Sequence, residues 1–155
     1  MIERELVFLN MAISTRDDAL TMIANKAQQL RFINDQSIFK QGIMEREMLI
    51  PTSVGFKVAI PHVKSAVVNM PFVAFMRTMQ EFRWDERNEE NVDFIFLIAI
   101  PEKAEGNLHL KFLSSISRKL MNEEFRNQLR NAQTVEEAYD MLETINKTIK
   151  GVETE

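Results

Sequence analysis

The chain has 155 residues, a formal net charge of −4 at pH 7 and no cysteine. This length suits one domain with a real core and is too short for two comfortable ones. Hydrophobic residues make up 45%, which is typical of a globular protein and not of a disordered one. The absence of cysteine excludes disulfides, thiolate metal sites and cysteine nucleophiles. Lys and Arg are scattered among Asp and Glu in a mildly acidic chain, so nothing electrostatic favours nucleic acid.

Neither a signal peptide nor a membrane span is visible in the sequence. Residues 1–5 are polar and mixed in charge, unlike the start of a signal peptide. The longest apolar run, 94–101, is too short to cross a bilayer. We therefore expect a cytoplasmic protein with no direct membrane insertion.

The first half of the chain predicts a strand and two helices. The strand covers 6–9 and 11–13, the first helix follows it to Leu30, and the second helix runs from about 36 to 48. Ser14 and Thr15 are an N-cap signal, and apolar residues then recur at helical spacing. Asn34 and Asp35 separate the two helices.

The middle of the chain predicts short strands at 58–60, 72–76, 82–84 and 92–100, the third at a sheet edge and the fourth ended by Pro101. Pro51 and Gly55 mark a loop before the first strand. The strand at 72–76 lacks alternation, which indicates burial on both faces.

Helices are expected over 108–121, from 122 to about 131, and after Thr134, which fits a capping box with Glu137. Residues 1–150 are expected to form the domain and 151–155 a frayed tail. Because helices and strands are interspersed, the pattern predicts a single α/β domain with a mixed, mostly buried sheet flanked by helices.

His62 is one of only two histidines and directly follows Pro61 at the end of the apolar run 58–60. Proline stiffens the backbone, and the apolar neighbours anchor the segment. We therefore expect His62 to face solvent or a cleft. Histidine changes charge near neutral pH and is a good nucleophile.

The second histidine, His109, is predicted to lie in the first turn of a helix. Free backbone N–H groups and the positive end of the helix dipole suit a bound phosphate there, and the same field favours neutral imidazole. A surface histidine at a helix start is the alternative. A carboxylate such as Asp93 could complete a metal site, but no local spacing such as His-x-x-x-His is present, so we expect no metal or other cofactor.

Arg46 lies near the end of the second predicted helix, between two glutamates and six residues before Thr52. An arginine in this setting is usually a solvated surface residue. A role in binding an anion needs support from elsewhere in the chain.

Five segments in a fixed order supply that support. They are Arg46-Glu47, Pro51-Thr52 with Gly55, Ala59-Ile60-Pro61-His62, the strand Phe94–Pro101, and His109-Leu110-Lys111-Phe112-Leu113. Together they resemble the fructose/mannitol-type enzyme IIA domains of the bacterial phosphoenolpyruvate-dependent sugar phosphotransferase system. The resemblance covers roughly residues 5 to 145. It departs from the family at Phe56 and Lys57, where small residues are common, and at 63–65, where a small or glycine-containing turn is more typical.

The resemblance implies a phosphoryl relay. His62 would take a phosphoryl group from the phosphohistidine of the phosphocarrier protein HPr, through one or the other ring nitrogen, and pass it to a cysteine of a cognate enzyme IIB. Arg46 would hold the phosphoryl oxygens, and His109 would donate to them. The hydroxyl groups of Thr52 and Ser53 are further phosphate-binding candidates. The other nitrogen of His62 is expected to donate to a backbone carbonyl group.

A relay site must be shallow and ringed by apolar surface on which two partners dock in turn. Val54, Phe56 and Met70 are candidates for that ring or for core positions. The resemblance also allows a regulatory, nitrogen-type IIA protein that reports its phosphorylation state by binding other proteins. A binding module with vestigial histidines is the third alternative.

Overall fold

A five-stranded mixed sheet forms the centre of the computed structural model, which describes residues 1–151. The elements in chain order are β1 (Ile2–Met11), α1 (Arg16–Gln29), α2 (Gln36–Leu49), β2 (Val58–Ala59), β3 (His62–Ser65), β4 (Phe72–Arg83), β5 (Asn91–Pro101), α3 (Leu108–Leu120), α4 (Glu123–Asn131) and α5 (Val135–Gly151). Gly151, predicted as part of a frayed tail, closes α5, and the rest of that tail lies outside the described residues.

The strand order is β1-β4-β5-β2, and β3 continues the same edge by pairing with β5. β1 is parallel to β4, β4 is antiparallel to β5, and both β2 and β3 are parallel to β5. The predicted α/β class with a mixed sheet is confirmed.

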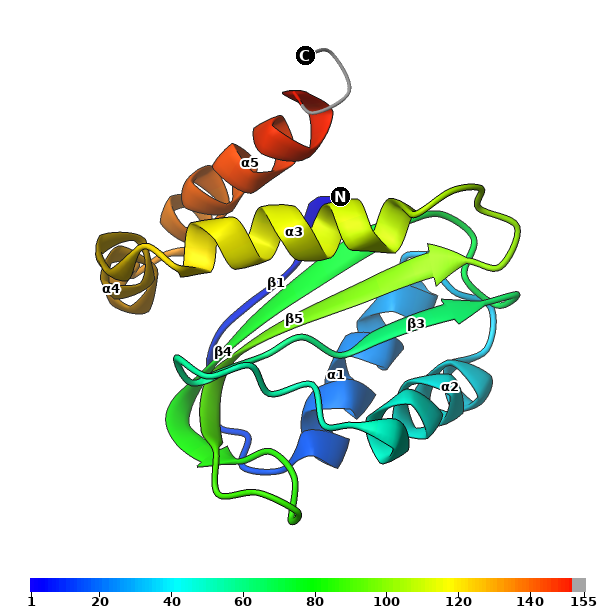
Figure 1. Cartoon of the computed structure of the whole chain (residues 1–155), viewed down its shortest axis with the longest axis horizontal. Helices are drawn as coiled ribbons and strands as arrows, with labels where there is room; N and C mark the ends of the chain where they lie inside the picture. Colours follow the sequence, from blue (N-terminus) through cyan, green and yellow to red (C-terminus); the bar gives the residue numbers. More distant parts are fainter. Residues whose placement is uncertain (152–155) are drawn as a thin grey trace.

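Helices cover both faces of this sheet, with α1 and α2 on one side and α3 and α5 on the other (Figure 1). The core under α1 and α2 includes Leu20, Ile23, Phe39, Ile43 and Leu97. The core under α3 and α5 includes Phe75, Phe94, Phe96, Ile116 and Leu142. Burial on both faces explains why the central strands read as continuous apolar runs.

The chain from 72 to 84 differs from the prediction. β4 is one strand of 12 residues and not two short ones, and Phe82 and Arg83 pair with β5 instead of forming a separate edge strand. A register shift lies between Arg77 and Phe82. The polar residues in this interval make the single strand look like two strands in the sequence. Arg77 is buried at this point of the strand. Its guanidinium donates to the Leu129 carbonyl at 2.8 Å and to Asn10 at 3.0 Å, and these bonds offset the cost of burying the charge.

β1 begins at Ile2, four residues before the predicted start, and ends at Met11. Asn146 of α5 accepts from the Ile2 N–H at 2.8 Å and donates to the Ile2 carbonyl at 3.1 Å. These two bonds satisfy the N–H and carbonyl groups of Ile2 at the start of the strand, which the charged residues 3–5 disguise in the sequence. No helix in the described part of the chain is long and apolar enough to span a bilayer.

The edge strand beside β5 is interrupted between β2 and β3. Pro61 has no N–H to give to the ladder, and the N–H of Ile60 donates to the Thr52 carbonyl at 2.9 Å. The ladder resumes when the Pro61 carbonyl accepts from Ile98 at 2.9 Å. His62 therefore opens β3, whereas the sequence placed it at the end of a strand.

Candidate functional site

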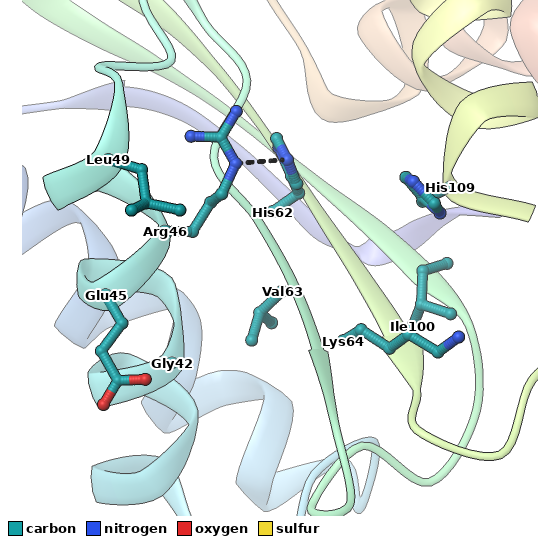
Figure 2. Close-up of a pocket in the computed structure, with 9 residues that line it drawn as sticks. All are labelled: Gly42, Glu45, Arg46, Leu49, His62, Val63, Lys64, Ile100 and His109. Carbon is teal, nitrogen blue, oxygen red and sulfur yellow. Dashed lines mark hydrogen bonds between the residues drawn. The ribbon is translucent and has the colours of Figure 1, made fainter. Parts of the chain in front are cut away.

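A cavity of about 460 Å³ lies at this edge of the sheet, between α2, β3 and the start of α3. Its lining residues are Gly42, Glu45, Arg46, Leu49, His62, Val63, Lys64, Ile100 and His109. Three of the predicted site residues, Arg46, His62 and His109, therefore come together from separate parts of the chain. Figure 2 shows His62 between Arg46 on one side and His109 on the other.

The alternation of side chains along β3 determines the face of the sheet on which His62 lies. Val63 belongs to the core beneath α1 and α2, so its neighbours His62 and Lys64 point to the opposite face. His62 pairs in register with Ile98, and Lys64 with Ile100. His62 is half-buried and lines the cavity, as expected from its place after Pro61.

Both nitrogens of the His62 ring have a partner. Nδ1 lies 3.0 Å from the Ile60 carbonyl oxygen, and Nε2 lies 3.1 Å from Nε of Arg46. A carbonyl oxygen only accepts and a guanidinium nitrogen only donates. The neutral ring with its proton on Nδ1 satisfies both contacts, and it leaves the lone pair on Nε2.

The pKa of His62 is lowered from 6.5, chiefly because burial penalises the charged imidazolium. The hydrogen bond to the Ile60 carbonyl opposes this effect, and the positive charge of Arg46 reinforces it. His109 lowers the pKa further and Glu47 raises it. The neutral, nucleophilic form is therefore favoured at pH 7.

Arg46 reaches the cavity from the last turn of α2. Besides its contact with His62, it donates from Nη1 to the Ile50 carbonyl at 2.9 Å. Both of its hydrogen bonds within the described residues go to neutral acceptors. The bond to Ile50 fixes the guanidinium at the helix end without neutralising its charge, which suits an anion in the cavity.

Glu47, the neighbour of Arg46, is completely buried. In the sequence it belongs to the Arg46-Glu47 segment, but no role of its own was predicted for it. Its carboxylate accepts from the Thr52 N–H at 3.0 Å, the Thr52 hydroxyl and the Trp84 Nε1 at 3.2 Å. Arg87 also donates to the Glu47 carbonyl and, at 2.7 Å, to the Met48 carbonyl. These contacts anchor the end of α2 that carries Arg46.

Thr52 and Ser53 do not line the cavity. Thr52 is 5% exposed and directs its hydroxyl to Glu47. Ser53 forms a bridge with Ala59, and its hydroxyl accepts from Asn88 at 3.3 Å. Contact between these two hydroxyls and a phosphate stays a prediction.

His109 lies in the first turn of α3, as predicted, and lines the cavity opposite Arg46. Asn107 is the N-cap residue of this helix, and its side chain makes no capping hydrogen bond. Lys64, for which the sequence indicated no role, also lines the cavity. Its side chain is exposed and makes no hydrogen bond or ion pair with any described residue. This end of the cavity is therefore rich in donors that an anion can use.

The loop before β2 takes an unusual backbone path. Gly55, Phe56 and Lys57 are consecutive residues with φ of 88°, 57° and 62°. A left-handed conformation costs a non-glycine residue about 1–2 kcal/mol, which explains why glycine suits these positions. Here Arg130 donates to the Phe56 carbonyl at 2.9 Å, and Arg126 stacks 4.1 Å from the centre of its ring.

Apolar side chains are exposed around the cavity and this loop. Leu49, on the cavity wall, is 76% exposed, and Val54 and Phe56 are both more than half exposed. Met70 is also exposed, so none of the three candidates for the apolar ring is a core residue.

Lys57 pairs with Glu81 at 2.7 Å and does not line the cavity. Among residues 1–151, no group of three or more potential ligand side chains could hold a metal ion.

Relatives with recorded functions resemble the chain over most of its length. It is 32% identical over 138 residues to the fructose-specific EIIA component of Haloferax volcanii, with 89% of each chain covered. It is 30% identical over 142 residues to a nitrogen regulatory protein of Bradyrhizobium diazoefficiens, with 92% of each covered. It also matches the longer fructose-specific EIIABC component of Mycoplasma pneumoniae at 33% identity, but spans only 17% of that protein and uses 78% of its own length.

Solved structures share the fold. The nitrogen regulatory protein IIA-Ntr of Neisseria meningitidis superposes with a TM-score of 0.81 at 26% identity, covering 91% of this chain and 95% of that one. IIA of the mannitol system of Escherichia coli, solved in complex with phosphorylated IIB, superposes with a TM-score of 0.78 at 20% identity, covering 93% and 99%. The family model described as "Phosphoenolpyruvate-dependent sugar phosphotransferase system, EIIA 2" matches residues 1–145. The chain therefore belongs to this family of phosphotransferase components.

Proposed function

We propose that His62 accepts a phosphoryl group on Nε2 from the phosphohistidine of HPr and passes it to a cysteine of a cognate enzyme IIB. The observation that carries this proposal is the pair of contacts on the His62 ring. The Ile60 carbonyl holds the proton on Nδ1, and the lone pair of Nε2 points to Arg46 at the cavity. Nε2 is therefore the nitrogen available for attack.

In the first step, the Nε2 lone pair attacks phosphorus as the N–P bond of the donor breaks, and the bonding electrons return to the donor ring. The Nδ1 proton stays on His62, whose ring gains positive charge. The Ile60 carbonyl, 3.0 Å from Nδ1, stabilises that charge. In the second step, a cysteine thiolate attacks phosphorus, the N–P bond of His62 breaks, and the electron pair returns to Nε2.

Phosphoryl transfer depends mainly on positioning and charge stabilisation. Arg46 exchanges its contact with Nε2 for contacts with the phosphoryl oxygens, which its planar fork fits. His109 and the uncapped start of α3 face the same group from the other side of the cavity. Thr52 and Ser53 would have to leave their present partners to reach it, so we assign them to holding the loop.

The exposed apolar side chains around the cavity suit a site that docks two proteins in turn. Leu49, Val54 and Phe56 offer apolar area beside an open cavity. The mannitol IIA of Escherichia coli, which shares this fold, was solved with phosphorylated IIB. This relationship supports a IIB partner for the present chain.

The test is to incubate the protein with enzyme I, HPr and phosphoenolpyruvate and to measure acid-labile phosphate per chain. We expect one phosphate per chain in the wild type and none in a folded His62→Ala variant. A small donor, phosphoramidate, repeats the test without HPr, so a mismatched carrier is distinguished from an inactive site. Stoichiometric labelling of His62→Ala would overturn the assignment.

Nitrogen regulation is a second candidate function. It is favoured by the 30% identity to the Bradyrhizobium diazoefficiens protein and by the TM-score of 0.81 to the Neisseria meningitidis IIA-Ntr. Both candidates use the same phosphorylated histidine and differ in the fate of its phosphoryl group. Transfer from the phosphorylated chain to a fructose- or mannitol-type IIB domain supports sugar transport, whereas labelling without onward transfer supports a regulatory role.

A further inference from the structure

Gly42 lies on α2 where the helix passes over β3. A β-carbon built on this residue would lie 2.8 Å from Cγ2 of Val63. Carbon atoms ordinarily meet at about 3.5–4.0 Å. Unlike Gly55 and Gly106, Gly42 is not a positive-φ glycine, so the need for glycine here is one of space and not of backbone conformation. Any side chain would force α2 and β3 apart or displace Val63.

This close contact lies next to the reacting groups. Gly42 and Arg46 are four residues apart on α2 and therefore lie on the same face of the helix. Val63 directly follows His62 in β3. The cavity is lined by both pairs, Gly42 with Val63 and Arg46 with His62 (Figure 2). The packing that brings Gly42 against Val63 is thus the packing that brings Arg46 to His62.

Val63 is poorly able to move away. It is 7% exposed and belongs to the core beneath α1 and α2. A β-branched side chain is stiff at χ1, and a close-packed core resists rotation. A separation of α2 and β3 by about 1 Å would restore ordinary carbon contacts. The same displacement would stretch the 3.1 Å contact between Arg46 and His62 beyond hydrogen-bonding range.

We propose that Gly42 is a positioning residue for the phosphoryl-transfer site: its missing side chain sets the spacing between α2 and β3 that places Arg46 on Nε2 of His62. The effect on transfer rate rests on the function proposed above. The effect on the ring of His62 does not, because it is present in the unphosphorylated protein.

The first measurement is therefore the pKa of His62 in unphosphorylated protein, followed by NMR. The groups that act on this ring are Arg46 and Glu47 from α2, His109 from α3 and the Ile60 carbonyl. Moving the Arg46 charge away removes an effect that lowers the pKa of His62. Gly42→Ala should therefore raise that pKa. With only two histidines in the chain, a His109→Asn variant assigns the signals.

Two background variants make the test specific. In a Val63→Ala background, Cγ2 is absent, and the Gly42→Ala change should no longer shift the pKa of His62. In an Arg46→Gln background, the charge is absent, and the shift should also disappear. If Gly42→Ala alone fails to fold, the Gly42→Ala/Val63→Ala protein should fold with the same His62 pKa as Val63→Ala. A double variant that stays unfolded, or keeps a raised pKa, contradicts the proposal.

The second measurement is single-turnover transfer from phosphorylated HPr. Gly42→Ala should slow it by about tenfold, corresponding to the loss of one hydrogen bond, and the loss should be relieved in the Val63→Ala background. An unchanged His62 pKa and rate in folded Gly42→Ala would overturn the proposal. A raised pKa in a protein that accepts no phosphate, even in the wild type, would instead count against the proposed function and leave the positioning intact.

Discussion

Nε of Arg46 lies 3.1 Å from Nε2 of His62, on the side of the ring opposite the bond between Nδ1 and the Ile60 carbonyl. One contact fixes the tautomer, and the other places a permanent cation at the nitrogen that carries the lone pair. The cation lowers the proton affinity of the ring and is in place to meet a phosphoryl group. Most of the expected behaviour of the site depends on this pair of contacts.

Replacement of Arg46 by lysine should slow phosphoryl transfer by roughly 30- to 150-fold. Lysine keeps the charge but loses the planar fork, and one charge-assisted contact is worth about 2–3 kcal/mol. The measurement is single-turnover transfer from phosphorylated HPr, with folding checked by circular dichroism. Arg118→Lys, at an exposed position of α3, is the matched control. A change under about threefold at Arg46, or about 0.65 kcal/mol, would make it an ordinary surface arginine.

The acceptance of phosphate should persist below pH 6.5, because the pKa of His62 is lowered, first by burial and then by Arg46. The unfolded chain binds the proton more readily than the folded one. Stability from this group is therefore present above pH 6.5 and is lost as the pH falls through the lowered pKa. NMR titration should give a midpoint below 6.5 that rises in Arg46→Gln. A midpoint at or above 6.5 in the wild type would refute this electrostatic account.

His109 should assist the transfer without accepting the phosphate. It lines the cavity from the first turn of α3, whereas the Nε2 lone pair of His62 already faces Arg46. His109→Ala should still be labelled to one phosphate per chain, more slowly, and should pass the group poorly to enzyme IIB. Transfer at the wild-type rate would show that His109 is incidental to the reaction.

Thr52 should act on stability more than on catalysis. Its hydroxyl and N–H both serve the buried carboxylate of Glu47. Thr52→Val removes the hydroxyl and leaves a buried acceptor short of one donor, which costs about 1–3 kcal/mol in the free energy of unfolding. Urea denaturation measures this loss, and labelling should still reach one phosphate per chain. Full stability with a transfer rate reduced by more than tenfold would instead indicate direct contact with the phosphoryl group.

Lys64 should attract anionic donors to the cavity. Its side chain is exposed on the same face as His62 and makes no hydrogen bond or ion pair with a described residue. Lys64→Gln should slow labelling by phosphoramidate several-fold at low salt, and the difference should fade as salt screens the charge. Lys147→Gln, on the exposed face of α5, removes the same charge far along the chain and is the control. Equal effects of both variants would mean that only net charge matters.

The sequence was sufficient for the fold class, which depends on local pattern, and local pattern also drew attention to His62. Arg46 and His109 became site candidates only through the family resemblance. The run before Pro101 predicted a buried strand, and the residues around His62 and His109 identified two site segments. Their joining at one sheet edge was expected from the family resemblance and not from periodicity. β3 was missed because Pro61 interrupts the strand and leaves only four residues of mixed polarity.

Contacts between distant residues were beyond the reach of the sequence alone. Trp84 donates to Glu47 across 37 positions, and nothing in either segment indicates the pairing. The Ile60 carbonyl could be identified only from the structure, which places it 3.0 Å from Nδ1 of His62. The space requirement at Gly42 depends on Val63, which belongs to another element.

The central claim, that Nε2 of His62 carries the phosphate, is tested most directly by NMR of the phosphorylated protein labelled with ¹⁵N-histidine. Phosphorus–nitrogen coupling identifies the nitrogen, and a His109→Asn variant identifies the residue. We expect one phosphate per chain, bound to Nε2 of His62, with the proton still on Nδ1. Coupling to Nδ1 of His62, or to either nitrogen of His109, would contradict it.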